Sequence, residues 1–187
     1  MALVLASKSP RRRALFSHIT PHFVVAEAGV DEGSLFEVAP ALFAQQLASQ
    51  KATEVFLQRG KDVVVGCDTV VEIAGEVLGK PKDRADAARM IGLLSGKKHR
   101  VHTGVSICLP GHEEQRFTET TAVYFAPVPQ QEVQAYVRTE EPYDKAGAYG
   151  IQGWAARYVT RIEGCFYNVM GLPVATLYHT LHTLGVV

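Results

Sequence analysis

The sequence predicts an α/β or α+β fold, in which helices flank a mixed β-sheet. Short β-branched runs predict buried strands, and the longest of them is VVVGCDTVVEI at 63–73. Longer segments bounded by helix-start and helix-stop residues predict helices. The two kinds of segment follow one another without strict alternation, which favours a mixed sheet over a purely parallel one.

Local signals delimit the elements of the first half of the chain. Ser9 followed by Pro10 is a helix-start signature, and Gly60 stands where a glycine ends a helix. The dipeptide Ala74-Gly75 marks the turn of a hairpin. The predicted elements are a strand at 3–6, the helix capped by Ser9, a strand at 23–26, a helix at 41–58 and a hairpin of 62–73 with 77–78.

The second half carries fewer and weaker signals. Asp83 is a helix N-cap candidate, and Gly96 marks the end of the same helix. The stretch EEPYDKAGAYGIQG is rich in glycine and predicts irregular structure. The predicted elements are a helix at 83–94, strands at 101–109 and 119–125, a helix at 129–138, a strand at 158–162 and one amphipathic helix at 168–184.

Composition excludes several classes of function. The chain has 187 residues with 19 basic and 19 acidic side chains, so its net charge is zero. It therefore has no bulk field for nucleic acid or an anionic membrane, and an anion site must be local. Three scattered cysteines without a Cys-x-x-Cys pair predict a reducing compartment. No apolar run has the length of a signal peptide or a membrane span, so we expect a cytoplasmic protein.

Three consecutive arginines, 11–13, occupy the first turn of the helix that Ser9 caps. The helix dipole disfavours cations there, and no acidic residue precedes Val25 to compensate. Guanidinium groups donate paired hydrogen bonds to phosphate or carboxylate. The run is therefore either an anion site or a set of solvated surface charges.

Asp68 lies inside the apolar run at 63–73. Burying an unpaired carboxylate costs several kcal/mol, so Asp68 must meet a cation, a metal or a wet cleft. The alternative is an Asp at a strand end that local backbone groups satisfy. Lys51 is similarly placed among apolar neighbours, because Leu47 and Val55 share its helix face. Lys51 either extends along that face to solvent or points into a pocket.

Two further polar residues stand in loops. Lys80 is presented by the rigid sequence LGKPKD, and Gln152 lies in the glycine-flanked AYGIQG, where backbone can approach a ligand. Asp144 and Lys145 precede it and are able to pair with each other. Isolated cations with a few acids suit a triphosphate site, where cations bind phosphates and carboxylates bind Mg²⁺.

Six ordered segments carry a resemblance to a known family. They are LASKSPRRRALF, GCDTVV, LGKPKDRADAARM, LSGKKHRVHTGV, EEPYDKAGAYGIQG and IEGCFYNVMGLPV. From about residue 3 to residue 174 the chain resembles the Maf family of nucleotide pyrophosphatases. Its DKAGAYGIQG segment is similar to the subgroup that prefers dTTP and UTP.

The resemblance implies a long mixed sheet with flanking helices, similar to the inosine triphosphate pyrophosphatases. It implies a single Maf-like domain over 1–187, with two lobes and a nucleotide cleft between them. The implied reaction is hydrolysis of a nucleoside triphosphate to the monophosphate and pyrophosphate with a divalent cation, Mg²⁺ or Mn²⁺. The resemblance also implies a cytoplasmic homodimer.

Site residues follow from the resemblance position by position. Asp68 matches the general base, and Glu32 with Asp68 matches the metal-binding acids. Positions tied to substrate choice are Arg11, Thr69 and Gln152. Phosphate-facing positions are Ser7, Arg12, Lys51 and Lys80. The usual alanine before the strand Asp is Cys67 here, which behaves as a small apolar residue.

Two alternatives to the enzyme remain open from the sequence. One is a non-catalytic nucleotide-binding regulator of cell division or septum formation. The other is a nucleic-acid-binding module, against which the neutral net charge and the lack of a continuous basic stripe argue.

Overall fold

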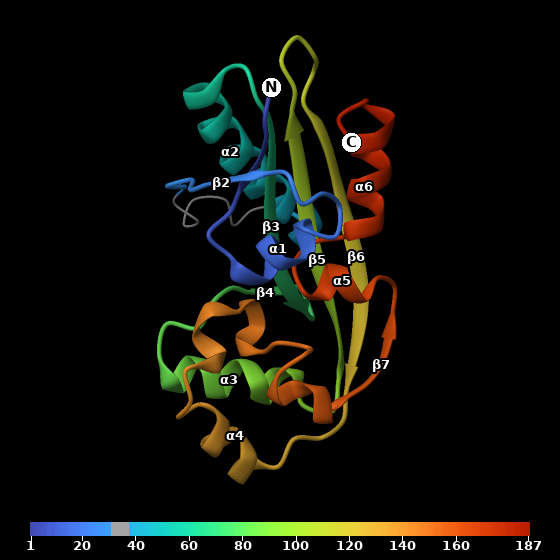
Figure 1. Cartoon of the computed structure of the whole chain (residues 1–187). Helices are drawn as coiled ribbons and strands as arrows, with labels where there is room; N and C mark the ends of the chain where they lie inside the picture. The colour runs from blue at the N-terminus through green and yellow to red at the C-terminus, as the bar shows by residue number, and fades with distance from the viewer. Residues whose placement is uncertain (31–37) are drawn as a thin grey trace. The chain divides into compact units, whose positions relative to one another are not determined.

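The computed structural model describes residues 1–30 and 38–187. Its strands form one seven-stranded sheet in the order β2-β1-β3-β5-β6-β7, with β4 paired to β3 (Figure 1). Strand β1 is parallel to β2 and β3, whereas β3–β4 and β6–β7 are antiparallel. The expected mixed α/β architecture is therefore confirmed. The strands are β1 (Leu3–Ala6), β2 (Val24–Ala26), β3 (Val63–Ile73), β4 (Glu76–Leu78), β5 (Lys98–Cys108), β6 (Gln115–Phe125) and β7 (Val159–Glu163).

The chain divides into two compact units. The first unit comprises Met1–Thr69, Thr103–Glu119 and Gly171–Val187, and the second comprises Val70–His102 and Thr120–Met170. Strands β3, β5 and β6 each contribute residues to both units. No helix in the described part of the chain is long and apolar enough to cross a bilayer.

The first unit contains the helices α1 (Pro10–Phe16), α2 (Pro40–Arg59) and α6 (Val174–Thr183). Ser9 caps α1 as expected, since its hydroxyl accepts the N–H of Arg12. Helix α2 lies along β3 (Figure 1), and Ala52 and Val55 of α2 form a core with Val4 and Val64. Gly60 ends α2 in the left-handed conformation, as the sequence predicts.

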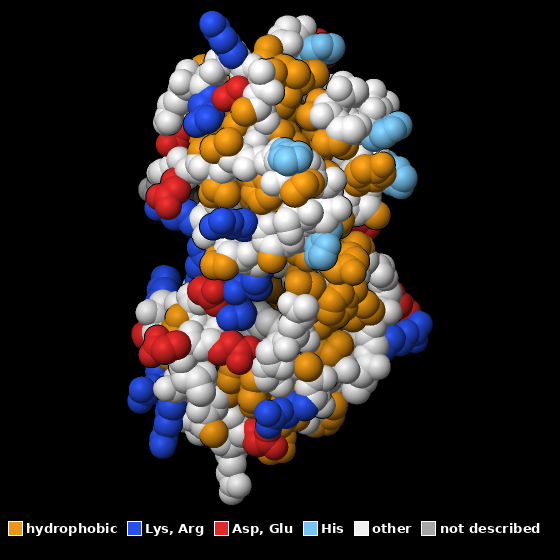
Figure 2. All heavy atoms as spheres, in the orientation of Figure 1, with side chains coloured by type: hydrophobic (Ala, Val, Ile, Leu, Met, Phe, Trp, Pro, Cys, Tyr) orange, Lys and Arg blue, Asp and Glu red, His pale blue; other side chains and the backbone are white. Residues whose placement is uncertain are grey.

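The second unit contains α3 (Arg84–Leu94), α4 (Gln130–Tyr136), α5 (Phe166–Val169) and three 3-10 turns. The turns are η1 (Glu141–Asp144), η2 (Ala146–Ala148) and η3 (Trp154–Arg157). Figure 1 shows α3 beside these turns, and buried side chains of α3, β6 and α4 form one core. Asp83 caps α3 by accepting the N–H of Asp86 at 2.8 Å. Exposed Phe166 and Tyr167 lie on α5, where Figure 2 shows hydrophobic side chains gathered.

The single helix expected at 168–184 is wrong. The structure has α5 and α6 there, separated by the sequence Gly171-Leu172-Pro173. Gly171 has φ +108°, outside the helical range, and proline disfavours helical backbone at the residue before it. Buried Asn168 fixes α5 instead, because its amide donates to Val101 O at 3.1 Å and to Thr121 Oγ1 at 2.9 Å.

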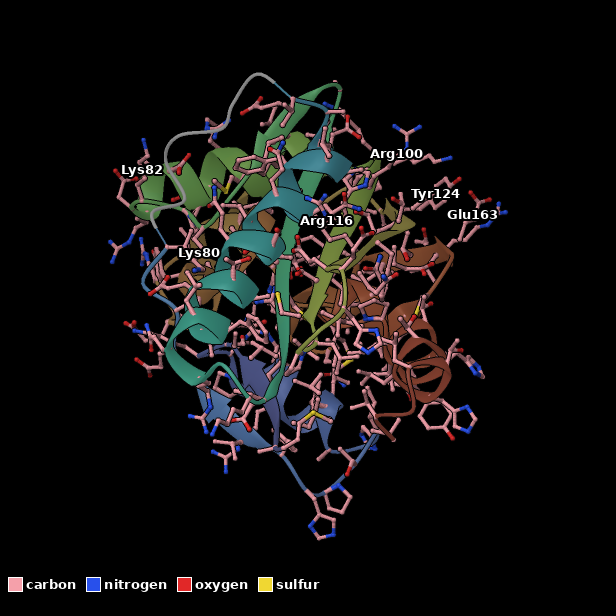
Figure 3. All side chains as sticks on the ribbon, turned by 90° about the horizontal axis from the view of Figure 1, so that it is seen from above. Lys80, Lys82, Arg100, Arg116, Tyr124 and Glu163 are labelled. Atoms are coloured by element: carbon pink, nitrogen blue, oxygen red, sulfur yellow. The ribbon has the colours of Figure 1, made fainter. Side chains whose placement is uncertain are left out.

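The strands β5 and β6 begin earlier than expected, at Lys98 and Gln115. Their first residues are polar, and the expectation followed the apolar pattern alone. A polar contact supports this part of β6, because Thr118 donates its hydroxyl to Ala41 O at 3.1 Å. At the other end of β6, Tyr124 donates its hydroxyl to Glu163 of β7 at 2.7 Å (Figure 3). That hydrogen bond holds the pKa of the Glu163 carboxyl below its usual range.

A buried histidine in the second unit makes stability depend on pH. His99 is 2% exposed, its Nε2 lies 2.7 Å from the hydroxyl of Tyr149, and burial lowers its pKa to about 4. The unfolded chain takes up a proton below about pH 6.5, whereas the folded chain does so only near pH 4. The free energy of unfolding should therefore fall by about 2 kcal/mol between pH 7.5 and 4.5 through His99 alone.

Urea unfolding of the wild type and His99→Gln at pH 7.5 and 4.5 measures this contribution. The variant should lose less stability on acidification, because glutamine does not titrate. Burial also lowers the pKa of His102, so part of the dependence should remain. Equal losses of stability in the wild type and the variant would show that His99 does not cause the pH dependence.

Candidate active site

The pairing of β1 with β3 positions the first polar residues of the site. The two strands are parallel, and Ala6 pairs with Gly66. Ser7 directly follows β1, and Asp68 stands two residues after Gly66 within β3. Both are buried, at 7% and 6% exposure. The Ser7 hydroxyl accepts the N–H of Ser9 at 3.2 Å, which shapes the turn into α1.

The buried carboxylate of Asp68 meets a cation. Lys51 Nζ lies 2.5 Å from Asp68 Oδ1, and the two side chains are 14% and 9% exposed. This contact answers two questions that the sequence raises. Asp68 does not rely on local backbone alone, and Lys51 is turned toward the sheet and does not extend along the helix to solvent.

Two glycines allow Lys51 to reach Asp68. A Cβ on Gly66 would lie 2.3 Å from Ala48 O, and a Cβ on Gly104 would lie 2.3 Å from the Ala44 carbonyl. The backbone of α2 therefore packs directly on β3 and β5, closer than any side chain would permit. Lys51 lies between Ala48 and Ala52, whose backbone atoms both approach Gly66, so its amino group comes into range of the strand.

Two hydrogen bonds within the first unit fix the side chain of Arg12. Its Nε donates to Gly171 O at 2.8 Å, and its Nη2 donates to Thr69 Oγ1 at 2.8 Å. Thr69 Oγ1 in turn lies 2.9 Å from Thr103 Oγ1, and Thr103 is fully buried. The guanidinium is thus held in one orientation beside the residue that follows Asp68.

The other two arginines of α1 differ in exposure. Arg11 is half-buried, whereas Arg13 is exposed, as the 100° step between successive helical residues predicts. Cys67 precedes Asp68 and is fully buried, and this burial raises the pKa of its thiol to about 12. Cys67 is therefore a neutral packing residue and not a nucleophile.

Lys80 and Gln152 belong to the second unit. Lys80 is exposed on the loop between β4 and α3, two residues before Lys82 (Figure 3). Gln152 is exposed in the turn before η3. The two segments are tied together, because the N–H of Gly147 donates to Gly79 O at 3.0 Å. Lys145 and Asp144 pair at 2.6 Å, as their adjacency suggests.

Metal-binding residues are few in the described ranges. Glu32 lies outside the described residues. Within 1–30 and 38–187, no three His, Cys, Asp or Glu side chains lie close enough to hold a metal by themselves. Of the two expected metal-binding carboxylates, Glu32 and Asp68, only Asp68 lies within the described residues. Carboxylate oxygens are ligands that Mg²⁺ prefers, and this ion is commonly held by one or two carboxylates together with substrate phosphates and water.

Sequence reasoning missed two residues of this site. Thr103 supports Thr69, and Gly171 provides a carbonyl for Arg12 in a conformation that favours glycine. A threonine inside the apolar strand HTGVSI was an available signal for the first. The second depends on a contact between residues 159 positions apart, which no local pattern reveals.

Comparisons with known proteins match this chain along almost its whole length. The family model described as Maf-like protein matches residues 2–184. A protein of Carboxydothermus hydrogenoformans named dTTP/UTP pyrophosphatase is 45% identical over 186 residues, 99% of this chain and 100% of the relative. A protein of the same name from Koribacter versatilis is 47% identical, covering 100% of this chain and 96% of the relative.

Two solved structures have folds similar to that of this chain. The Ham1 protein of Staphylococcus aureus has a TM-score of 0.54 at 15% identity, covering 97% of this chain and 98% of its own. A HAM1 protein from Coxiella burnetii has the same TM-score at 12% identity, with the same coverage. The expected likeness to this fold is confirmed. The full-length match to the family model and to these relatives shows that the chain belongs to the Maf-like protein family.

Proposed function

We propose that this chain hydrolyses dTTP and UTP, or modified pyrimidine nucleotides, to the monophosphate and pyrophosphate. The observation that carries the proposal is the buried Asp68–Lys51 pair, in a chain that matches relatives named dTTP/UTP pyrophosphatase along its full length. A carboxylate held this way suits a base, and the cations near it suit a polyanion.

Asp68 is the proposed general base. It takes a proton from a water molecule, whose oxygen attacks the α-phosphorus as the bond to the bridging oxygen of the β-phosphate breaks. Pyrophosphate leaves with that oxygen. Lys51 holds the carboxylate in place before the nucleotide binds and supplies positive charge to phosphate oxygens. Ser7, Arg12 and Lys80 are the other proposed phosphate ligands.

A divalent cation, Mg²⁺ or Mn²⁺, is part of the proposal. Asp68 and Glu32 would hold it together with phosphate oxygens. When bound, it neutralises negative charge on the triphosphate. Asp68, already buried against Lys51, provides the carboxylate oxygens that such an ion prefers.

Base choice is assigned to Gln152, Arg11 and Thr69. The side-chain amide of glutamine offers both hydrogen-bond donors and an acceptor, which suits the imide edge of thymine or uracil. Thr69 has a fixed hydroxyl, because Arg12 and Thr103 both contact it. The exposure of Gln152 leaves its amide accessible to a ligand.

We also propose a cytoplasmic homodimer with two lobes, on the ground of the resemblance. The main alternative function is a non-catalytic nucleotide-binding regulator of cell division. Nucleic-acid binding is disfavoured by the zero net charge, and basic and acidic side chains are interspersed on the face in Figure 2.

Pyrophosphate release with Mg²⁺ from dTTP, UTP, ATP and GTP tests the proposed function. dTTP and UTP should turn over much faster than the purine nucleotides. A flat profile would refute the base preference, and binding without any turnover would favour the regulator.

Arg12 and Arg13 provide a matched pair of neighbouring arginines. Arg12→Ala should lower kcat/KM for dTTP on the order of 10²-fold, because it removes a phosphate ligand and releases Thr69. Arg13→Ala should leave kcat and KM close to those of the wild type, since its side chain is exposed. Steady-state kinetics of both variants measure the difference, and equal losses would contradict the assignment of Arg12.

A further inference from the structure

The turn that carries Gln152 is held by two side chains, Glu141 of η1 and Lys145, which directly follows η1. We propose that Glu141, acting through the backbone of Gly153 and Trp154, positions Gln152 for recognition of the pyrimidine base. The inference rests on the proposed function, in which Gln152 contacts the base. Glu141 is a positioning residue here, because it acts through the turn and not on the substrate.

The Glu141 carboxylate lies directly against the residue after Gln152. Its Oε1 and Oε2 accept the N–H of Trp154 at 3.1 and 3.3 Å. A Cβ built on Gly153 would lie 1.9 Å from Glu141 Oε1. Gly153 has φ −95°, outside the left-handed region that favours glycine. The glycine at 153 instead leaves the space that the carboxylate occupies.

Lys145 supports the other end of the same turn. A Cβ on Gly150 would lie 2.9 Å from Lys145 Cε, so the lysine stem lies against that glycine. Lys145 Nζ donates to Glu141 O and to Asp144 Oδ1, both at 2.6 Å, and its side chain is 14% exposed. The turn from Gly150 to Gly153 closes with a hydrogen bond of 3.0 Å between them.

The flanks of the turn are anchored in the core of the second unit. The Trp154 ring stacks on Tyr136 with 4.1 Å between centroids and an angle of 10°. Tyr136 donates its hydroxyl to Ala148 O at 3.0 Å. Gln152 itself is exposed, and the backbone of the turn fixes the point from which its side chain extends. Of the side chains named above, Glu141 alone accepts a hydrogen bond from the backbone within two residues of Gln152.

Four variants separate positioning from simple stability, with kcat and KM measured for dTTP and ATP. Glu141→Ala should lower the preference for dTTP over ATP by about tenfold, mainly through KM for dTTP, while kcat changes little. Glu141→Gln keeps an oxygen acceptor for the Trp154 N–H and should restore most of the preference. Glu140→Ala, an exposed neighbour, should behave as the wild type. Gln152→Ala should lose the preference outright.

Gly153→Ala provides an independent route to the same result. Its methyl group should displace the Glu141 carboxylate and lower the preference as Glu141→Ala does. In the double variant the methyl group occupies vacated space, so the second substitution should add no further loss. Losses that add, or a Glu141→Ala enzyme with wild-type preference, would overturn the inference.

The same measurements separate this inference from the proposed function. A wild type without preference for dTTP or UTP refutes the proposed function itself. A wild type with that preference, whose Gln152→Ala variant loses it while Glu141→Ala retains it, overturns only the role of Glu141. Preference retained by Gln152→Ala would overturn both the assignment of Gln152 and the inference built on it.

Discussion

Asp68→Asn is expected to lower kcat for dTTP hydrolysis by about 10²- to 10⁴-fold, the range that general-base catalysis contributes. The amide cannot accept a proton from the attacking water. The asparagine retains an oxygen that can accept the hydrogen bond from Lys51. The contact between α2 and β3 is therefore kept, and the fold should persist. Single-turnover pyrophosphate release measures the chemical step, and titration with a non-hydrolysable dUTP analogue should show that the nucleotide still binds.

Glu72→Gln is the matched control for this substitution. Glu72 lies on the same strand and is buried to a similar extent, at 8% against 6% for Asp68. Its carboxylate accepts the N–H of Gly75 at 2.7 Å, and the amide oxygen replaces that acceptor. Glu72→Gln should therefore keep most of kcat. Near-normal turnover by Asp68→Asn would remove Asp68 from the role of base.

Gly66→Ala is expected to lower the free energy of unfolding strongly. Its methyl group would lie 2.3 Å from Ala48 O and 2.7 Å from Ala52 N, and both atoms belong to helix backbone. Backbone cannot move aside as a side chain does, so α2 must shift away from β3. Overpacking of this kind costs about 3 kcal/mol in the free energy of unfolding. The shift should also withdraw Lys51 from Asp68 and lower kcat.

Gly92→Ala is the control for that prediction. Gly92 is exposed in α3, and a Cβ there meets nothing within 4 Å. Alanine in a helix should raise the free energy of unfolding by about 0.5 to 1 kcal/mol. Urea unfolding and kcat measure both variants. If Gly66→Ala retained wild-type stability and kcat, the close approach of α2 to the sheet would not position Lys51.

Much of the fold could be predicted from local sequence signals. The strand at 63–73, the caps at Ser9, Gly60 and Asp83 and the hairpin turn at Ala74-Gly75 all correspond to elements of the structure. The single helix expected at 168–184 is wrong because Gly171 and Pro173 interrupt the helix, although the apolar spacing continues across them. The strand starts at Lys98 and Gln115 were not predicted because the first residues of both strands are polar and lack the apolar alternation of a buried face.

The site could be predicted only in part. The chemistry of Asp68 and Lys51 indicated that each needs an unusual partner, but their contact joins residues 17 positions apart on a helix and a strand. Local pattern predicts each element but not which side chains face each other across them. Thr103 and Glu141 contact residues far from them in the sequence, so the sequence does not show which hydroxyl or which turn each one contacts.

Hydrolysis of dTTP in oxygen-18 water tests the central claim most directly. If a water activated by Asp68 attacks the α-phosphorus, mass spectrometry should find one labelled oxygen in dTMP and none in pyrophosphate. Label in pyrophosphate, or in inorganic phosphate released from the γ position, would place the attack at another phosphorus and contradict the account.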